Sequence, residues 1–130
     1  MPSAPRCVVP RYSRQVILSS RHAGKVAIVR LDGRLTLGPA LHKLKPRVDT
    51  ILSSNPSTGL VLDLSAVPDI DSAGVGELLT IHTSATRRGL RVALANVNRR
   101  VNEVLEITRL DGIFTICGDE KSALEHVAQT

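Results

Sequence analysis

The sequence predicts a single α/β domain, a mixed sheet of four to five strands (largely parallel) flanked by about four helices. Three observations predict this class. Short β-branched apolar runs alternate with longer segments whose apolar residues recur at helical spacing. Two strand-like runs come first, and helices and strands alternate after them, an order that requires parallel crossovers. The chain has 130 residues, 42% of them hydrophobic, which suffices for one core over residues 13–128.

The N-terminal part of the sequence predicts a tail and then a β-hairpin. Residues 1–12 hold three prolines and show no apolar period, so we expect a flexible tail. The runs at residues 14–18 and 25–31 are apolar and β-branched, and we expect His22-Ala23-Gly24 to form the turn between them. Asp32-Gly33 predicts a second turn, which ends the hairpin.

A first helix is predicted from Gly38-Pro39, because proline is favoured at the first helical position. Pro46 lies inside this pattern and should kink the helix or divide it in two. Residues 55–59 then predict a loop. The apolar positions of this helix are Leu41, Leu44, Val48, Ile51 and Leu52.

The central part of the sequence predicts a buried strand that leads into a second helix. Residues 59–64 form an apolar run of strand length. The helix starts near Ser72, whose hydroxyl can cap the first backbone N–H groups, and Gly89 ends it. Its inward positions are Val75, Leu78, Leu79 and Ala85.

The C-terminal part continues the alternation. A strand is predicted at residues 90–95, a third helix after Asn98, and a short strand at residues 113–116. Asp119 is expected to cap a last helix. The inward positions of these two helices are Val101, Val104, Leu105 and Thr108, and Ala123, Leu124 and Val127.

Charge and composition exclude several classes of protein. Residues 1–50 hold ten Lys and Arg against two acidic residues, a net charge of +8, whereas residues 51–130 carry −3. This basic half favours an acidic partner, nucleic acid, or simply a solvated surface. The pairs Arg87-Arg88 and Arg99-Arg100 lack stacking aromatics, so nucleic acid is not the expected partner. We expect no membrane insertion, because no apolar run spans a bilayer. Two distant cysteines, Cys7 and Cys117, indicate a reducing cytoplasm.

Ser72 is the candidate functional residue. A phosphate on a hydroxyl at a helix start lies at the positive end of the helix dipole. An esterase nucleophile would need glycine two residues earlier, and Ile70 stands there, so we expect no catalytic residue. The histidines share no ligand spacing, and we expect no metal site. Asp63, Asp69 and Asp71 suit Mg²⁺ by type, but a structural role for them is favoured.

Several segments resemble the STAS domain family, whose best-known members are bacterial anti-sigma-factor antagonists. The resemblance covers about residues 15–127. Its most specific part is the turn at residues 71–76, Asp-Ser-Ala-Gly-Val-Gly, and the strand before it, residues 59–65, agrees. Further matches are Gly33-Arg34-Leu35, the strand end at residues 94–97 and the helix at residues 104–111.

The resemblance implies partner switching. Ser72 matches the serine that an anti-sigma factor with serine kinase activity phosphorylates. The unphosphorylated antagonist captures that ATPase and releases the sigma factor, and a phosphatase resets the switch. ATP would bind to the kinase, so no cofactor is expected in this chain. The residues expected to contact the partner are Gly33, Thr36, Asp71, Ser72, Ala73, Gly74, Val75, Gly76 and Glu77.

The sequence departs from the family in two respects. Thr36 stands where antagonists often carry an acidic residue, and the chain is basic where antagonists are commonly acidic. An alternative role therefore stays open, as a non-phosphorylated STAS subunit of a lipid-transport or stress-signalling complex. Under the leading hypothesis, phosphate would add nearly two negative charges beside Asp69, Asp71 and Glu77, which disfavours a desolvated contact.

Overall fold

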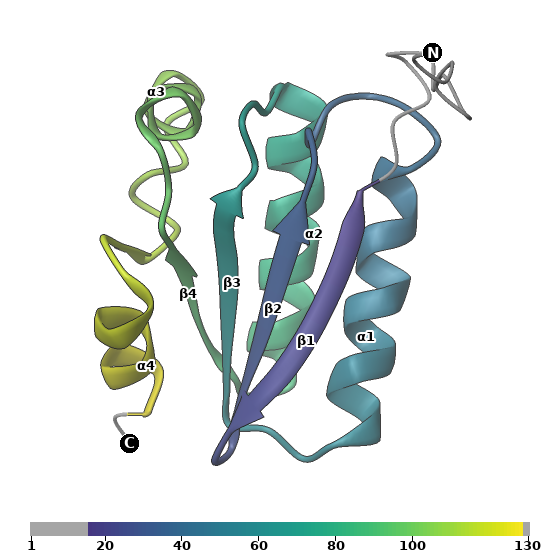
Figure 1. Cartoon of the computed structure of the whole chain (residues 1–130), viewed down its shortest axis with the longest axis vertical. Coiled ribbons are helices and arrows are strands. Elements are labelled where there is room, and N and C mark those ends of the chain that lie inside the picture. The colour runs from purple at the N-terminus through teal and green to yellow at the C-terminus, as the bar shows by residue number, and fades with distance from the viewer. Residues whose placement is uncertain (1–15, 129–130) are drawn as a thin grey trace, which may run out of the picture.

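The computed structural model describes residues 16–128, which form a five-stranded sheet with helices on both faces (Figure 1). The expected tail and residues 14–15 of the first predicted strand lie outside the described residues. The elements in chain order are β1 (Ile17–Ala23), β2 (Val26–Asp32), a 3₁₀ turn (Leu41–Lys43), α1 (Leu44–Ser54), β3 (Gly59–Ala66), α2 (Ser72–Arg87), β4 (Arg91–Ala95), α3 (Arg99–Ile107), β5 (Ile116–Cys117) and α4 (Glu120–Ala128).

The strands lie in the sheet in the same order as in the sequence, β1-β2-β3-β4-β5. β1 runs antiparallel to β2, and every later neighbour pairs in parallel. Helices α1 and α2 cover one face, and α4 covers the other (Figure 1). The predicted α/β class, with its largely parallel mixed sheet, is confirmed.

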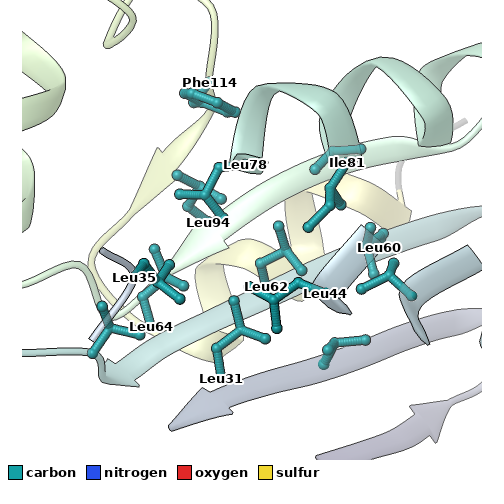
Figure 2. Packing of buried hydrophobic residues seen from close by; sticks show 14 of the residues in the cluster. Leu31, Leu35, Leu44, Leu60, Leu62, Leu64, Leu78, Ile81, Leu94 and Phe114 are labelled. Atoms are coloured by element: carbon teal, nitrogen blue, oxygen red, sulfur yellow. The ribbon is translucent and has the colours of Figure 1, made fainter. Parts of the chain in front are cut away.

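The core is aliphatic and lies mainly between the sheet and the α1–α2 layer. Alternate residues of β2 and β3 point into it, and both helices contribute an apolar stripe (Figure 2). Each fully buried leucine contributes about 1.5–3 kcal/mol by leaving water. The fully buried leucines that Figure 2 labels are Leu31, Leu35, Leu44, Leu60, Leu62, Leu64, Leu78 and Leu94. A smaller cluster on the opposite face packs Val61 and Ala93 against α4.

The hairpin turn differs from the prediction. β1 continues through Ala23, so His22 and Ala23 belong to the strand, and the turn consists of Gly24 and Lys25. Gly24 has φ +61°, the left-handed conformation that two-residue hairpin turns require of their first residue. The prediction was wrong because β1 is an edge strand with mostly exposed side chains, so it carries little apolar alternation.

The first helix also starts later than predicted. Pro39 lies in a turn, and the α-helix begins at Leu44, directly after the 3₁₀ turn. Pro46 falls in the first turn of α1, where backbone N–H groups have no intrahelical partner, so it causes no break of its own. The helical segment is therefore divided before the proline and not at it.

The short strand predicted at residues 113–116 shrinks to Ile116–Cys117. Phe114 instead ends a turn in which its N–H donates to Leu110 O at 3.1 Å. Its ring is buried and meets His82 edge-on, with 5.3 Å between ring centroids. Burial lowers the pKa of His82 below its ordinary value, so the neutral ring is favoured at this contact. Because the Phe114 side chain is buried in the core from a turn, residues 113–115 do not join the strand.

Three helix ends agree with the sequence. Asn98 accepts a hydrogen bond from Val101 N at 2.8 Å and caps α3, and Asp119 accepts from Ser122 N at 2.7 Å at the start of α4. Gly89 follows the end of α2 with φ +83°. Within residues 16–128 no helix is both long enough and apolar enough to cross a bilayer.

Candidate functional site: the tip of helix α2

The connections that leave β2 and β3 are joined by backbone hydrogen bonds. Gly33 N donates to Ala66 O at 3.1 Å, and Leu35 N donates to Asp69 O at 3.1 Å. In the same pair of connections, Asp71 N donates to Leu35 O at 3.2 Å. Because the carboxyl ends of parallel strands meet at one edge of a sheet, these two connections lie side by side there. They form one hydrogen-bonded unit at the start of α2.

The Asp71 carboxylate fixes the start of α2. Its Oδ1 accepts from Gly74 N at 2.9 Å, and its Oδ2 accepts from Leu37 N at 2.9 Å. Asp71 is therefore the N-cap, with an extended backbone, and Ser72 is the first helical residue. The prediction that the Ser72 hydroxyl caps the helix was wrong. Both residue types cap helices well, but only the side chain of the last extended residue reaches back to the third helical N–H.

Ser72 lies exposed at this helix tip. Among residues 16–128 its hydroxyl has no hydrogen-bond partner, and neither do the backbone N–H groups of Ser72 and Ala73. Unpaired N–H groups make a helix start electropositive. The tip therefore combines a reachable hydroxyl with donors suited to an anionic group attached to it.

The two glycines of the tip have different roles. Gly74 is buried, and a Cβ added to it would lie 1.9 Å from Leu35 O. A Cβ on Gly76 would meet nothing within 4 Å. Gly74 thus permits close packing of α2 on the Leu35 segment, whereas Gly76 faces solvent.

Glu77 mainly holds two helices together. Its Oε2 accepts from Lys45 N at 3.1 Å, at the start of α1, and its side chain is only 11% exposed. His42 Nδ1 lies 4.0 Å from Oε1. A carboxylate at a helix N-terminus interacts favourably with the helix dipole. Little of the Glu77 charge is presented to solvent.

The residues predicted to contact a partner thus fall into three groups. Ser72 and Gly76 are exposed, and Gly74 and Val75 are buried and support the tip from inside. The half-buried residues are Gly33, Thr36, Asp71, Ala73 and Glu77.

Helix α3 anchors the connection between β3 and α2. Asn98 Nδ2 donates to Val67 O at 2.7 Å, and Arg100 Nε donates to Asp69 Oδ1 at 3.0 Å. The Arg100 hydrogen bond outweighs the small cost of burial and, with the charges of Arg100 and Arg34, lowers the pKa of Asp69. No local sequence pattern predicts this anchor, because the residues that it joins are about 30 positions apart.

The carboxylates considered for Mg²⁺ have structural roles. Asp63 Oδ1 accepts from Ser65 N at 2.9 Å and from Asn96 Nδ2 at 3.1 Å. Asp69 and Asp71 are engaged as described above. In the part of the chain that the structure describes, His, Cys, Asp and Glu nowhere gather in a group of three suited to a metal ion.

Leu37 is an exposed residue that the sequence analysis did not single out. Its backbone N–H is bound to Asp71, yet its side chain is 73% exposed. Leu35, two residues earlier, is fully buried and fixes the segment from the other side. The backbone that carries this large apolar side chain is thus held beside the α2 tip.

The fold and the site together define an α/β domain that presents an exposed serine at a helix tip beside an exposed leucine. The sequence matches the model of the STAS domain over residues 18–123, and the chain belongs to this family.

Named relatives agree with this assignment. The chain is 27% identical over 107 residues to the anti-sigma F factor antagonist of Paenibacillus polymyxa. The match covers 82% of this chain and 91% of that protein. It is 41% identical over 68 residues to a TM1081 homolog of Thermotoga neapolitana that is named as an anti-sigma factor antagonist. That match covers 52% of this chain and 60% of the relative's length. The crystal structure of TM1081 from Thermotoga maritima superimposes with a TM-score of 0.77 at 28% identity, covering 86% of this chain and 95% of that one.

The contrast between the two glycines gives a testable prediction for stability. Gly74→Ala should lower the free energy of unfolding by about 1–3 kcal/mol, because its Cβ collides with the Leu35 carbonyl. Gly76→Ala should raise it by about 0.5–1 kcal/mol, because alanine is the better helix former and the site is open. Urea unfolding of both variants measures this; equal effects of the two substitutions would contradict the packing described for Gly74.

Proposed function

We propose that this chain is an anti-sigma factor antagonist, controlled by phosphorylation of Ser72. Its partners are an anti-sigma factor with serine kinase activity and a phosphatase that removes the phosphate. The observation that carries the proposal is the exposed Ser72 hydroxyl at the start of α2, fixed by the Asp71 cap. The names of the relatives support the regulatory role.

Phosphorylation would act on the contact and not on the fold. A phosphate at the first helical position meets free N–H groups and the positive end of the helix dipole, so α2 tolerates it. Against a docked partner the same phosphate adds bulk and nearly two negative charges. At a desolvated interface such a change costs affinity, up to a few kcal/mol.

The chain itself acts by binding and not by catalysis in this proposal. No histidine hydrogen-bonds to the Ser72 hydroxyl within residues 16–128, so nothing seen there activates it as a nucleophile. The kinase partner would supply both ATP and the phosphoryl-transfer machinery. Ser72 would only accept the phosphoryl group, and its accessibility would decide the reaction.

The first prediction of this proposal concerns Ser72 itself. Incubation with the cognate anti-sigma kinase and ATP should add one phosphate, located at Ser72 by mass spectrometry. Ser72→Ala should remain unmodified. It should bind the anti-sigma factor with about the affinity of the unphosphorylated wild-type chain. Ser72→Glu should bind at least about tenfold more weakly, a loss of about 1.4 kcal/mol, while α2 stays folded because glutamate suits a helix start.

Thr80→Ala is the matched control, since Thr80 is an exposed hydroxyl two turns further along α2. It should be phosphorylated at Ser72 as wild type is. Loss of phosphate in Thr80→Ala, or unchanged binding of Ser72→Glu, would refute the switch. Retention of an unmodified chain in a larger assembly would instead favour the non-phosphorylated scaffold role.

The second prediction concerns Leu37 as an apolar contact of the same partner. Leu37→Ser should weaken partner binding by about tenfold or more, because a buried leucine is worth about 1.5–3 kcal/mol. Ile107→Ser is the matched control, since Ile107 is 77% exposed on α3 and Leu37 is 73% exposed. It should change affinity by less than about twofold. Calorimetry on both variants measures this, and equal losses would show that Leu37 has no special role.

A further inference from the structure

The outer face of the α1–α2 layer is basic. Residues 41–54 and 72–88 hold five lysines and arginines against two acidic residues. Three of the five line one groove, and we call these three the basic face: Lys45, Arg87 and Arg88. On the opposite side of the sheet, α4 and the residue before it carry three acidic residues against one lysine (Figure 1). The α1–α2 layer and α4 therefore carry net charges of opposite sign.

The two carboxylates of the α1–α2 layer are already engaged within the domain. Asp49 Oδ2 accepts from Lys45 Nζ at 2.7 Å, and its Oδ1 accepts from Ser84 Oγ at 3.0 Å and lies 3.9 Å from Arg88 Nη2. Glu77 accepts from Lys45 N, as described above. Lys45 and Arg88 nevertheless stay 36% and 37% exposed. The face thus keeps an excess of positive charge that no described acidic side chain neutralises.

A groove of about 490 Å³ lies on this face, and no carboxylate lines it. Lys45, Arg87 and Arg88 supply its charge, and Leu79 and Thr83 line it between them. Arg87 forms no ion pair with any residue in the described range 16–128. A groove with cationic walls and a small, partly apolar floor suits an extended or helical segment that carries Asp and Glu.

The groove is continuous with the α2 tip. Five residues follow one side of α2 within an arc of about 80°, given 100° per residue. They are Ser72, Gly76, Thr80, Thr83 and Arg87. A protein docked on the tip would therefore extend over the groove.

We propose that this groove binds an acidic segment of the same anti-sigma factor that docks at Ser72. The inference rests on the proposed function and adds the chemistry of the partner surface to it. The groove supplies attraction and orientation, and Ser72 supplies the switch. Charge complementarity argues for this occupant, because the described helical face has no free acidic group of its own.

The two parts of the surface act independently in this proposal. Ser72 and Arg87 are 15 residues apart on one helix, about 22 Å at 1.5 Å per residue. The Debye length at physiological salt is about 8 Å. A phosphate on Ser72 therefore leaves the potential at Arg87 nearly unchanged. The fold-loss in affinity from removing groove charge and the fold-loss from modifying the Ser72 hydroxyl should therefore multiply when the two changes are combined.

Charge reversal in the groove tests this inference. Arg87→Glu should lower the association rate constant for the anti-sigma factor about tenfold at low salt, with the difference shrinking as salt rises. The matched control Lys121→Glu makes the same charge change on α4, an exposed site across the sheet, and should stay within about twofold of wild type. Combined with Ser72→Glu, Arg87→Glu should lower affinity by the same factor as it does alone.

Thr83→Glu is the second variant, because it adds a carboxylate to the groove and leaves the arginine at the end of α2 in place. It should also slow association, whether or not Arg87→Glu folds well. Wild-type association rates for both groove variants would overturn the inference while the proposed function stands. The inference would also be overturned if the two groove variants lost binding to duplex DNA but kept wild-type binding to the anti-sigma factor. Failure of wild type to bind any anti-sigma factor would instead remove the proposed function, and this inference with it.

Discussion

One carboxylate, that of Asp71, determines how the α2 tip is arranged. Its two oxygens accept hydrogen bonds from Gly74 N and Leu37 N, each at 2.9 Å. Hydrogen bonds to a charged group contribute about 1.5–3 kcal/mol each, more than most of the neutral bonds nearby. Because both oxygens belong to one side chain, the helix start and the Leu37 segment cannot shift independently. The relative positions of Ser72 and Leu37 follow from this shared acceptor.

Packing beneath the tip makes that arrangement rigid. Leu35 is fully buried, and its carbonyl lies where a side chain at position 74 would be, so α2 approaches as closely as glycine allows. Helix α3 fixes the same connection from the other side through Asn98 and Arg100. A surface held in this way is pre-organised, and it loses little conformational entropy when a partner binds. A phosphate added to such a surface changes the contact without needing to change the fold.

The sequence predicts the architecture well and the details of the site less well. Apolar periodicity finds every helix and the order of helices and strands along the chain, because burial against one sheet imposes that pattern. It misplaces the cap of α2, since Asp71 and Ser72 both suit the position and only the backbone conformation distinguishes them. It does not predict that Leu37 lies beside the α2 tip, because that position depends on a hydrogen bond to Asp71, a residue distant in the sequence. It misjudges residues 113–116, where the core takes Phe114 out of the strand.

Amide hydrogen exchange at Leu37 and Gly74 tests most directly whether one carboxylate couples the two segments. Both amides should be protected in wild type. In Asp71→Ala both should exchange at least about tenfold faster, while Leu62 in the middle of β3 keeps its protection. If the Gly74 amide loses protection and the Leu37 amide does not, or if neither changes, the Asp71 carboxylate does not couple the two segments, and the role assigned to it is wrong.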